Sequence, residues 1–147
     1  MRKFITASLL LVGSLCADIH ERIDTLIPAL IQVESGGNLQ AIGDNGKSWG
    51  QLQIQQGVVT DVNRVYKTNY KHKEAFYYYG SVELCLLYLD YWAKRYELNT
   101  GKKATYEILA HLWNGGPHAY KATGEKRENL EKYWAKVREQ LEKNERS

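Results

Sequence analysis

The sequence predicts a mainly α-helical fold in a single domain, with a small irregular or β-like loop region after the first helix. At 147 residues the chain is long enough for one sizeable core and too short for two. Hydrophobic residues at 44% and charged residues at 25% are ordinary globular values, which argue against a disordered chain. Apolar side chains recur at helical spacing in several segments, with no internal repeat and no linker between them.

The N-terminal segment, residues 1–17, has the composition of a cleaved secretory signal peptide. Two basic residues precede an apolar run, and small residues stand where the chain turns polar at Asp18. The run is too short to form a stable membrane span, so we expect an exported protein, periplasmic or secreted. The alternative is a bacterial lipoprotein acylated at Cys16, although Leu15 is bulkier than expected just before such a cysteine.

The remaining domain, residues 18–147, is nearly neutral. Arg2 and Lys3 supply two of the three formal positive charges, so the domain itself carries +1. Its lysines and glutamates are mixed rather than gathered in a basic stripe, which argues against nucleic-acid binding. Once Cys16 is removed, only Cys85 remains, and its apolar surroundings predict a buried thiol and no internal disulfide.

Apolar spacing predicts helices over residues 19–34, 58–66, 82–96, 106–113 and 124–143. Ser81 and Thr105 are the expected N-terminal caps of the third and fourth helices. Pro28 either kinks the first helix or starts a second segment there. Residues 38–48 are rich in turn-forming residues, and the polar and aromatic stretch 67–80 is expected to be a loop.

Glu34 and Asp44 are the candidate catalytic residues, because their surroundings favour opposite ionisation states. Glu34 lies in the last turn of an apolar helix, where desolvation and the helix dipole favour the protonated acid. Asp44 lies in a polar loop where water, amides and Lys47 favour the carboxylate. One acid held neutral beside one held charged suits the cleavage of glycosidic bonds. Taken alone, Glu34 could equally be a solvated helix-end residue, and Asp44 part of a turn.

Three motifs change that balance: ALIQVESGGN, then GDNGKSWGQLQIQ, and much later AHLWNGGP. In order and spacing they resemble the lysozyme-like superfamily, both the lytic transglycosylase domain of soluble transglycosylases and the invertebrate-type lysozymes. The resemblance covers about residues 25–137. It implies a lysozyme-like fold with Glu34 as the catalytic acid, a Gly-x-x-Gln motif ending at Gln53 along the cleft, and an Asn-Gly-Gly-Pro turn from Asn114 across it.

The two families differ at the position of Asp44. Transglycosylase domains of this kind usually lack a second acid, whereas invertebrate-type lysozymes place an aspartate shortly before the Gly-x-x-Gln segment. Those lysozymes are rich in disulfides, however, and this chain has none to offer. The loop therefore favours hydrolysis, while the cysteine content favours a bacterial enzyme.

The activity that the resemblance implies is a muramidase cleaving the β-1,4 bond between N-acetylmuramic acid and N-acetylglucosamine. The expected partners are peptidoglycan glycan strands, and the protein is expected to be a monomer. Glu34 would protonate the leaving oxygen, and Asp44 would stabilise or capture the developing cation or activate water. Without Asp44, the 6-hydroxyl of muramic acid would attack, as in a lytic transglycosylase giving 1,6-anhydro products. The alternative from another class is a non-catalytic glycan-binding or secretion-machinery protein with the same fold.

Four further residues are candidate substrate contacts: Ser48, Gln53, Trp113 and Asn114. The amides of Gln53 and Asn114 can hydrogen-bond N-acetyl groups and ring hydroxyls. Ser48 can orient Asp44 or the attacking water. We expect Asp44 to lie across an open cleft from Glu34, with both amides lining the same cleft.

Aromatic residues offer flat faces on which sugars can stack, namely Trp49, Trp113 and the run Tyr77–Tyr79. Trp92 and Trp134 lie on apolar helix faces and are expected in the core. The four histidines show no metal-ligand spacing, and no glycine-rich phosphate loop precedes a helix, so we expect neither a metal site nor a cofactor.

Overall fold

Five α-helices and two short strands make up most of the computed structural model, which describes residues 5–147. The helices are α1 (Ile5–Ser35), α2 (Gln56–Tyr66), α3 (Tyr78–Thr100), α4 (Tyr106–Gly115) and α5 (Gly124–Glu145), and the strands are β1 (Ile42–Gly43) and β2 (Ser48–Trp49). The prediction of a mainly α-helical single domain is therefore confirmed. Arg2 and Lys3 of the proposed signal peptide lie outside the described residues.

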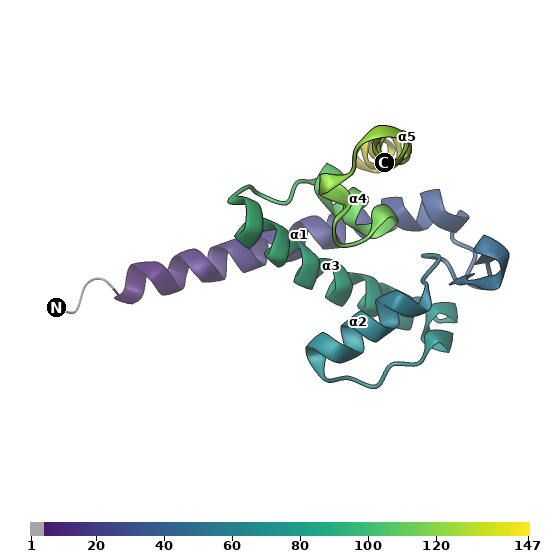
Figure 1. Cartoon of the computed structure of the whole chain (residues 1–147), viewed down its shortest axis with the longest axis horizontal. Coiled ribbons are helices and arrows are strands. Elements are labelled where there is room, and N and C mark those ends of the chain that lie inside the picture. Colours follow the sequence, from purple (N-terminus) through teal and green to yellow (C-terminus); the bar gives the residue numbers. More distant parts are fainter. Residues whose placement is uncertain (1–4) are drawn as a thin grey trace.

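Helix α1 is the central element of the core. Its side chains Ile23, Leu26 and Leu30 are completely buried, as an apolar stripe at helical spacing requires. The helix contacts α3, α4 and α5. Figure 1 shows α3 alongside α1, and α5 seen end-on above α4, while α2 lies below α3.

Pro28 lies inside α1, and the helix continues through it to Ser35. The alternative that a second segment begins at Pro28 is therefore wrong. Pro28 itself is exposed, whereas Ala29 and Leu30 beside it are completely buried. Burial of the residues around Pro28 thus outweighs the one backbone hydrogen bond that a proline removes. Gly36 follows the helix as its C-terminal cap, with a φ of 64° in the left-handed region and an N–H that donates to the carbonyl of Gln32.

The small β-like region after α1 is a two-stranded antiparallel sheet. Ile42 pairs with Trp49, and Gly43 pairs with Ser48, so residues 44–47 form the turn between the strands. A short 3-10 helix, η1 (Asp44–Gly46), occupies most of that turn. Leu52 and Ile54, which follow β2, are completely buried and anchor this region to the helical core.

Helix α3 begins at Tyr78, so the prediction that Ser81 caps it is wrong. Ser81 is completely buried one turn inside the helix. Its hydroxyl donates to the carbonyl of Tyr78 at 2.9 Å and accepts from Nε2 of Gln51 at 2.8 Å. The segment 67–80 also contains a 3-10 helix, η2 (His72–Phe76), and is not only loop. Contacts of η2 with β2 and α3 stabilise it, and local sequence preferences do not report such contacts.

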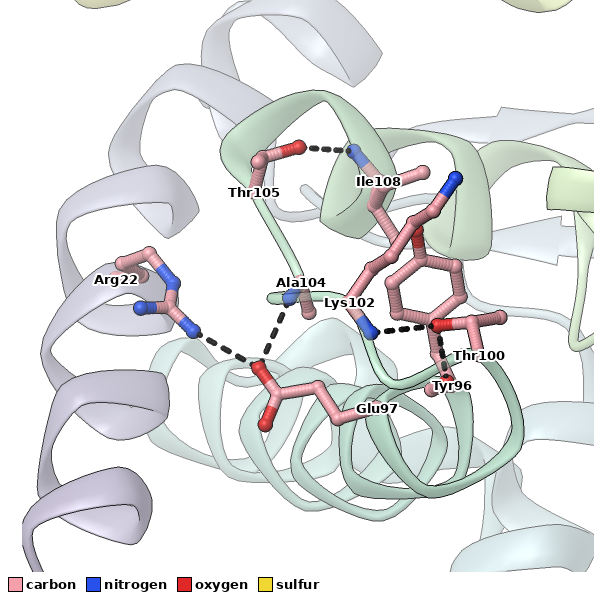
Figure 2. A network of polar contacts seen from close by, with 8 residues as sticks. All are labelled: Arg22, Tyr96, Glu97, Thr100, Lys102, Ala104, Thr105 and Ile108. Carbon is pink, nitrogen blue, oxygen red and sulfur yellow. Dashed lines mark hydrogen bonds and ion pairs between the residues drawn. The ribbon is translucent and has the colours of Figure 1, made fainter.

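A polar network holds the connection between α3 and α4 against α1 (Figure 2). Oε1 of Glu97 accepts from Nη2 of Arg22 at 3.3 Å and from the N–H of Ala104 at 2.8 Å. Thr105 then accepts the N–H of Ile108 at 3.3 Å, which confirms the predicted cap of α4. The network fixes the start of α4, whose last turn reaches the candidate site.

Cys85 is completely buried in α3, as predicted. Burial raises the pKa of its thiol well above the ordinary value, so a reactive thiolate is not favoured. Residues 5–17 of the proposed signal peptide form the first turns of α1, and their removal stays a prediction. Between residues 5 and 147, no helix combines the length and apolar composition needed to cross a membrane.

Asp90, a residue that is 5% exposed, joins three helices through its carboxylate. Its carboxylate accepts hydrogen bonds from Nε2 of His20 in α1 at 2.7 Å, from the hydroxyl of Tyr66 in α2 at 2.8 Å, and from Nζ of Lys94 at 2.9 Å. Burial acts to raise the pKa of Asp90, but the hydrogen bonds from Lys94 and Tyr66 outweigh it and lower the pKa.

Replacing Asp90 by Asn is expected to lower the free energy of unfolding by about 2 kcal/mol at pH 7, because hydrogen bonds to a charged group contribute about 1.5–3 kcal/mol. The folded-state pKa is lowered, so this contribution is complete above the unfolded pKa of about 3.9 and is lost as the pH falls through the folded value. Urea unfolding at pH 7 and at about pH 2.5 should show the difference between the two proteins shrinking in acid. Glu139→Gln, at an exposed pair with Lys143, is the control and should leave stability unchanged. An equal difference at both pH values would contradict this role of Asp90.

Candidate functional site

A cavity of about 680 Å³ opens at the C-terminal end of α1. All six residues predicted for the site line it: Glu34, Asp44, Ser48, Gln53, Trp113 and Asn114. They come from the last turn of α1, the β1–β2 region, the segment after β2 and the last turn of α4. The structure thus brings together side chains that lie as far apart in the sequence as positions 34 and 114.

Glu34 is half-buried in this cavity. Burial raises the pKa of its carboxyl group above the ordinary value, and the nearby charge of Asp44 raises it further. Hydrogen bonding from the side chains of Tyr133 and Trp113 acts in the opposite direction but does not cancel the effect of burial. Glu34 is therefore an acid that keeps its proton to a higher pH than an exposed glutamate does.

Tyr133 of α5 is a site residue that sequence reasoning missed. Its hydroxyl donates to Oε1 of Glu34 at 2.7 Å, across 99 positions of sequence. Burial and the charge of Glu34 raise the pKa of Tyr133, so the hydroxyl stays a donor. In the sequence Tyr133 belongs to the apolar face of the last helix, and no local pattern separates it from a core residue.

Asp44 is exposed, and its carboxylate is held by two neighbours. Ser48 donates from Oγ to Oδ2 of Asp44 at 2.5 Å, and Nε2 of Gln55 donates to the same oxygen at 3.3 Å. Gln55 also lies 3.2 Å from Oγ of Ser48. The expectation that Ser48 could orient Asp44 fits this geometry, whereas Gln55 was not among the predicted residues.

The turn that carries Asp44 is held in a strained backbone conformation. Asp44 and Asn45 have φ values of 49° and 54°, in the left-handed region that residues with a Cβ seldom adopt. Gln53, which follows β2, shares this conformation with a φ of 51°. Lys67 is the fourth such non-glycine residue in the described part of the chain. Strain of this kind costs about 1–3 kcal/mol per residue and is concentrated at functional sites in proteins.

The two predicted amides lie on different parts of the cavity wall. Nε2 of Gln53 donates to the carbonyl of Gly50 at 3.0 Å, which fixes the side chain next to the sheet. Asn114 is exposed in the last turn of α4. The next residue is Gly115, and a side chain there would place its Cβ 2.7 Å from Cδ2 of Leu130. Close packing against α5 therefore positions this end of α4.

The aromatic residues divide into cavity-lining and other roles. Trp113 lines the cavity and packs edge-to-face on Tyr88, with ring centroids 5.8 Å apart. The rings of His72 and Phe76 stack on Trp49, with ring centroids 3.8 Å and 5.1 Å from that of Trp49. Neither Trp49 nor the run Tyr77–Tyr79 is among the described residues that line the cavity. The aromatic side chains that line this cavity are therefore Trp113 and Tyr88.

Helix α2 supplies a wall that the sequence did not predict, formed by Gln56, Gly57, Val58, Thr60 and Asp61. Asp61 adds a third carboxylate to the cavity and accepts from Nε1 of Trp92 at 3.3 Å. Trp92 packs on the core as expected. Among residues 5–147, no lysine, arginine or histidine lines the cavity, so this lining is acidic and rich in amides.

No protein-family model, curated protein or solved structure matches this chain. The resemblance to the lysozyme-like superfamily therefore depends on three short motifs, and a function has to be argued from the site itself. Within residues 5–147, no group of three or more metal-ligating side chains occurs.

Tyr133→Phe is expected to raise the pKa of Glu34 further, because it removes a hydrogen bond that stabilises the ionised carboxylate. Carbon-13 NMR of glutamate-labelled protein, titrated over pH, measures this value in both proteins. Tyr120→Phe removes a hydroxyl from a different aromatic pair, with Tyr96, and should leave the titration unchanged. A Glu34 midpoint that stays the same or falls in Tyr133→Phe would show that the hydrogen bond does not act on this carboxyl group.

Proposed function

We propose that this protein is a peptidoglycan-cleaving glycosidase, a muramidase that acts on the β-1,4 bond between N-acetylmuramic acid and N-acetylglucosamine. One observation carries the proposal: a glutamic acid whose pKa is raised by burial lies in an open cavity with a hydrogen-bonded aspartate. Two carboxyl groups in contrasting surroundings are the arrangement that most glycosidases use to hydrolyse a glycosidic bond.

Glu34 acts first as general acid. Its proton passes to the glycosidic oxygen as the bond to the anomeric carbon breaks, so the leaving group departs as a neutral hydroxyl. Tyr133 donates to Oε1 of Glu34 and holds the carboxyl group in place for this transfer. The Glu34 carboxylate then accepts a proton from the attacking water and is restored.

Asp44 faces the positive charge that develops at the anomeric carbon. Its carboxylate stabilises or captures this cation, or activates the water. The hydrogen bonds from Ser48 and Gln55 to Oδ2 keep the side chain in one orientation, so little reorganisation accompanies the reaction. The strained loop supports the same purpose, because it fixes a short acid at the edge of the cavity.

The cavity suits an uncharged sugar chain. A volume of about 680 Å³ lies within the range of ligand-binding pockets, about 300–1,000 Å³. Gln53 and Asn114 can pair with acetamido groups and hydroxyls, and Trp113 presents an aromatic surface. The lining that the described residues form contains acidic and no basic side chains, which disfavours a phosphorylated or sulfated polymer.

Glu34→Gln is expected to reduce cleavage at least about 100-fold, because an amide cannot donate the required proton. Clearing of a purified cell-wall suspension measures the rate, and co-sedimentation with the walls tests that binding persists. Glu128→Gln on the exposed face of α5 is the matched control and should retain full activity. Near-normal clearing by Glu34→Gln would remove the basis of the proposed function.

Asp44→Asn is expected to reduce the rate at least about 10-fold with the fold preserved, because a charge next to the developing cation is lost. Mass spectrometry of the wild-type products should show muramic acid at the reducing end, one water heavier than the 1,6-anhydro form. Asp24→Asn, at an exposed position on α1, is the control. If Asp44→Asn is silent and the products lack one water, muramic acid attacks itself and the protein is a lytic transglycosylase.

A further inference from the structure

A second hollow, of about 320 Å³, adjoins the proposed cleft. Its lining consists of Gly46, Lys47, Trp49, Gln55, Gln56, Gly57 and His72. The three consecutive residues 55–57 line both the main cavity and this hollow, so they form a ridge between the two. A ligand that occupies the main cavity can therefore reach the hollow with a short side arm.

The sign of the charge changes across this ridge. In the described part of the chain, the main cavity is lined by the carboxyl groups of Glu34, Asp44 and Asp61 and by no basic residue. The hollow is lined by Lys47 and by no acidic residue of that part. Lys47 is exposed, and the nearest acid in sequence, Asp44, directs its carboxylate to Ser48 and Gln55 instead.

The walls of the hollow are already in place without a ligand. The rings of Trp49 and His72 stack with an interplanar angle of 3°. Nε1 of Trp49 donates to the carbonyl of Gly46 at 2.8 Å, and Nε2 of His72 lies 2.7 Å from the carbonyl of Ile54. Binding there would need little ordering of these side chains, which favours affinity.

We propose that the hollow binds a carboxylate of the peptide stem that muramic acid carries on its lactyl ether. The proposal rests on the proposed function, because it needs the muramic acid ring to occupy the main cavity. A neutral glycan backbone is compatible with the acidic cleft, and an acidic arm is compatible with Lys47 across the ridge. Glycans without such an arm, such as chitin oligomers, leave the hollow empty and bind less tightly.

The contact between the stem carboxylate and Lys47 is expected to change substrate binding and not the rate of the chemical step. The arm lies away from the bond that breaks, so its contacts are equal in the ground state and the transition state and lower KM without changing kcat. A hydrogen-bonded ion pair that remains open to water is expected to change kcat/KM by about 3- to 10-fold.

The test compares kcat/KM on peptide-bearing glycan strands with kcat/KM on the same strands after the carboxylates of the peptide stems have been converted to amides. The wild-type protein should prefer the strands with free stem carboxylates by about 3- to 10-fold, through KM. Lys47→Met should bring this ratio close to one, and Lys47→Glu should bring it below one. Any influence of Lys47 on Asp44 affects both substrates and cancels in the ratio. Lys73→Met removes an exposed charge outside the hollow and is the matched control.

Equal efficiency of the wild type on both substrates, or a ratio that Lys47→Met leaves unchanged, overturns the proposal while the cleavage assignment stands. Absence of cleavage from either substrate refutes the proposed function instead. In that case NMR titration with the free acidic stem peptide decides whether the hollow binds it. Shifts of the Trp49 indole that disappear in Lys47→Met support the site, and an undisturbed spectrum overturns it.

Discussion

The burial of one carboxyl group, that of Glu34 at the end of α1, is the constraint on which the rest of the site depends. Desolvation disfavours the charged form, so the surroundings must be apolar enough to raise the pKa yet polar enough to hold the side chain. Tyr133 meets the second condition with a 2.7 Å hydrogen bond. That contact requires α5 to return to α1 after almost the whole chain, and Leu130 against Gly115 helps to fix α5 on α4.

Asp44, the second acid, lies in surroundings opposite to those of Glu34. Asp44 stands on a strained turn between two-residue strands, exposed to water and held by Ser48 and Gln55. Rigid helices thus hold the group proposed to give up a proton, and a braced loop holds the group proposed to face the cation. Asp90 supports the same framework at a distance, because it ties α1 and α2 to α3. The position of α2 in turn sets the ridge and the wall that bound the two hollows.

Local chemistry made part of this predictable. An apolar stripe ending in a single acid located Glu34, and three short motifs located Asp44, Ser48, Gln53, Trp113 and Asn114, all of which line one cavity. The roles of Tyr133 and Ser81 could not be predicted because they depend on contacts between distant segments, with Glu34 and with Gln51. From the sequence, Tyr133 resembles a core residue and Ser81 resembles a helix cap. Gln55 contacts Ser48 nearby in the chain, but no sequence pattern marks it. The helix also passes through Pro28 because packing of its neighbours outweighs local preference.

The most direct test of the account is the pH dependence of kcat/KM for cell-wall cleavage, set beside the NMR titration of Glu34 in the same free protein. The fall in rate on the alkaline side reports the pKa of the essential acid in the free enzyme. If Glu34 is that acid, both midpoints coincide and lie above the ordinary value for glutamate, as burial requires. Cleavage that continues undiminished at pH values where Glu34 is fully ionised would contradict the account.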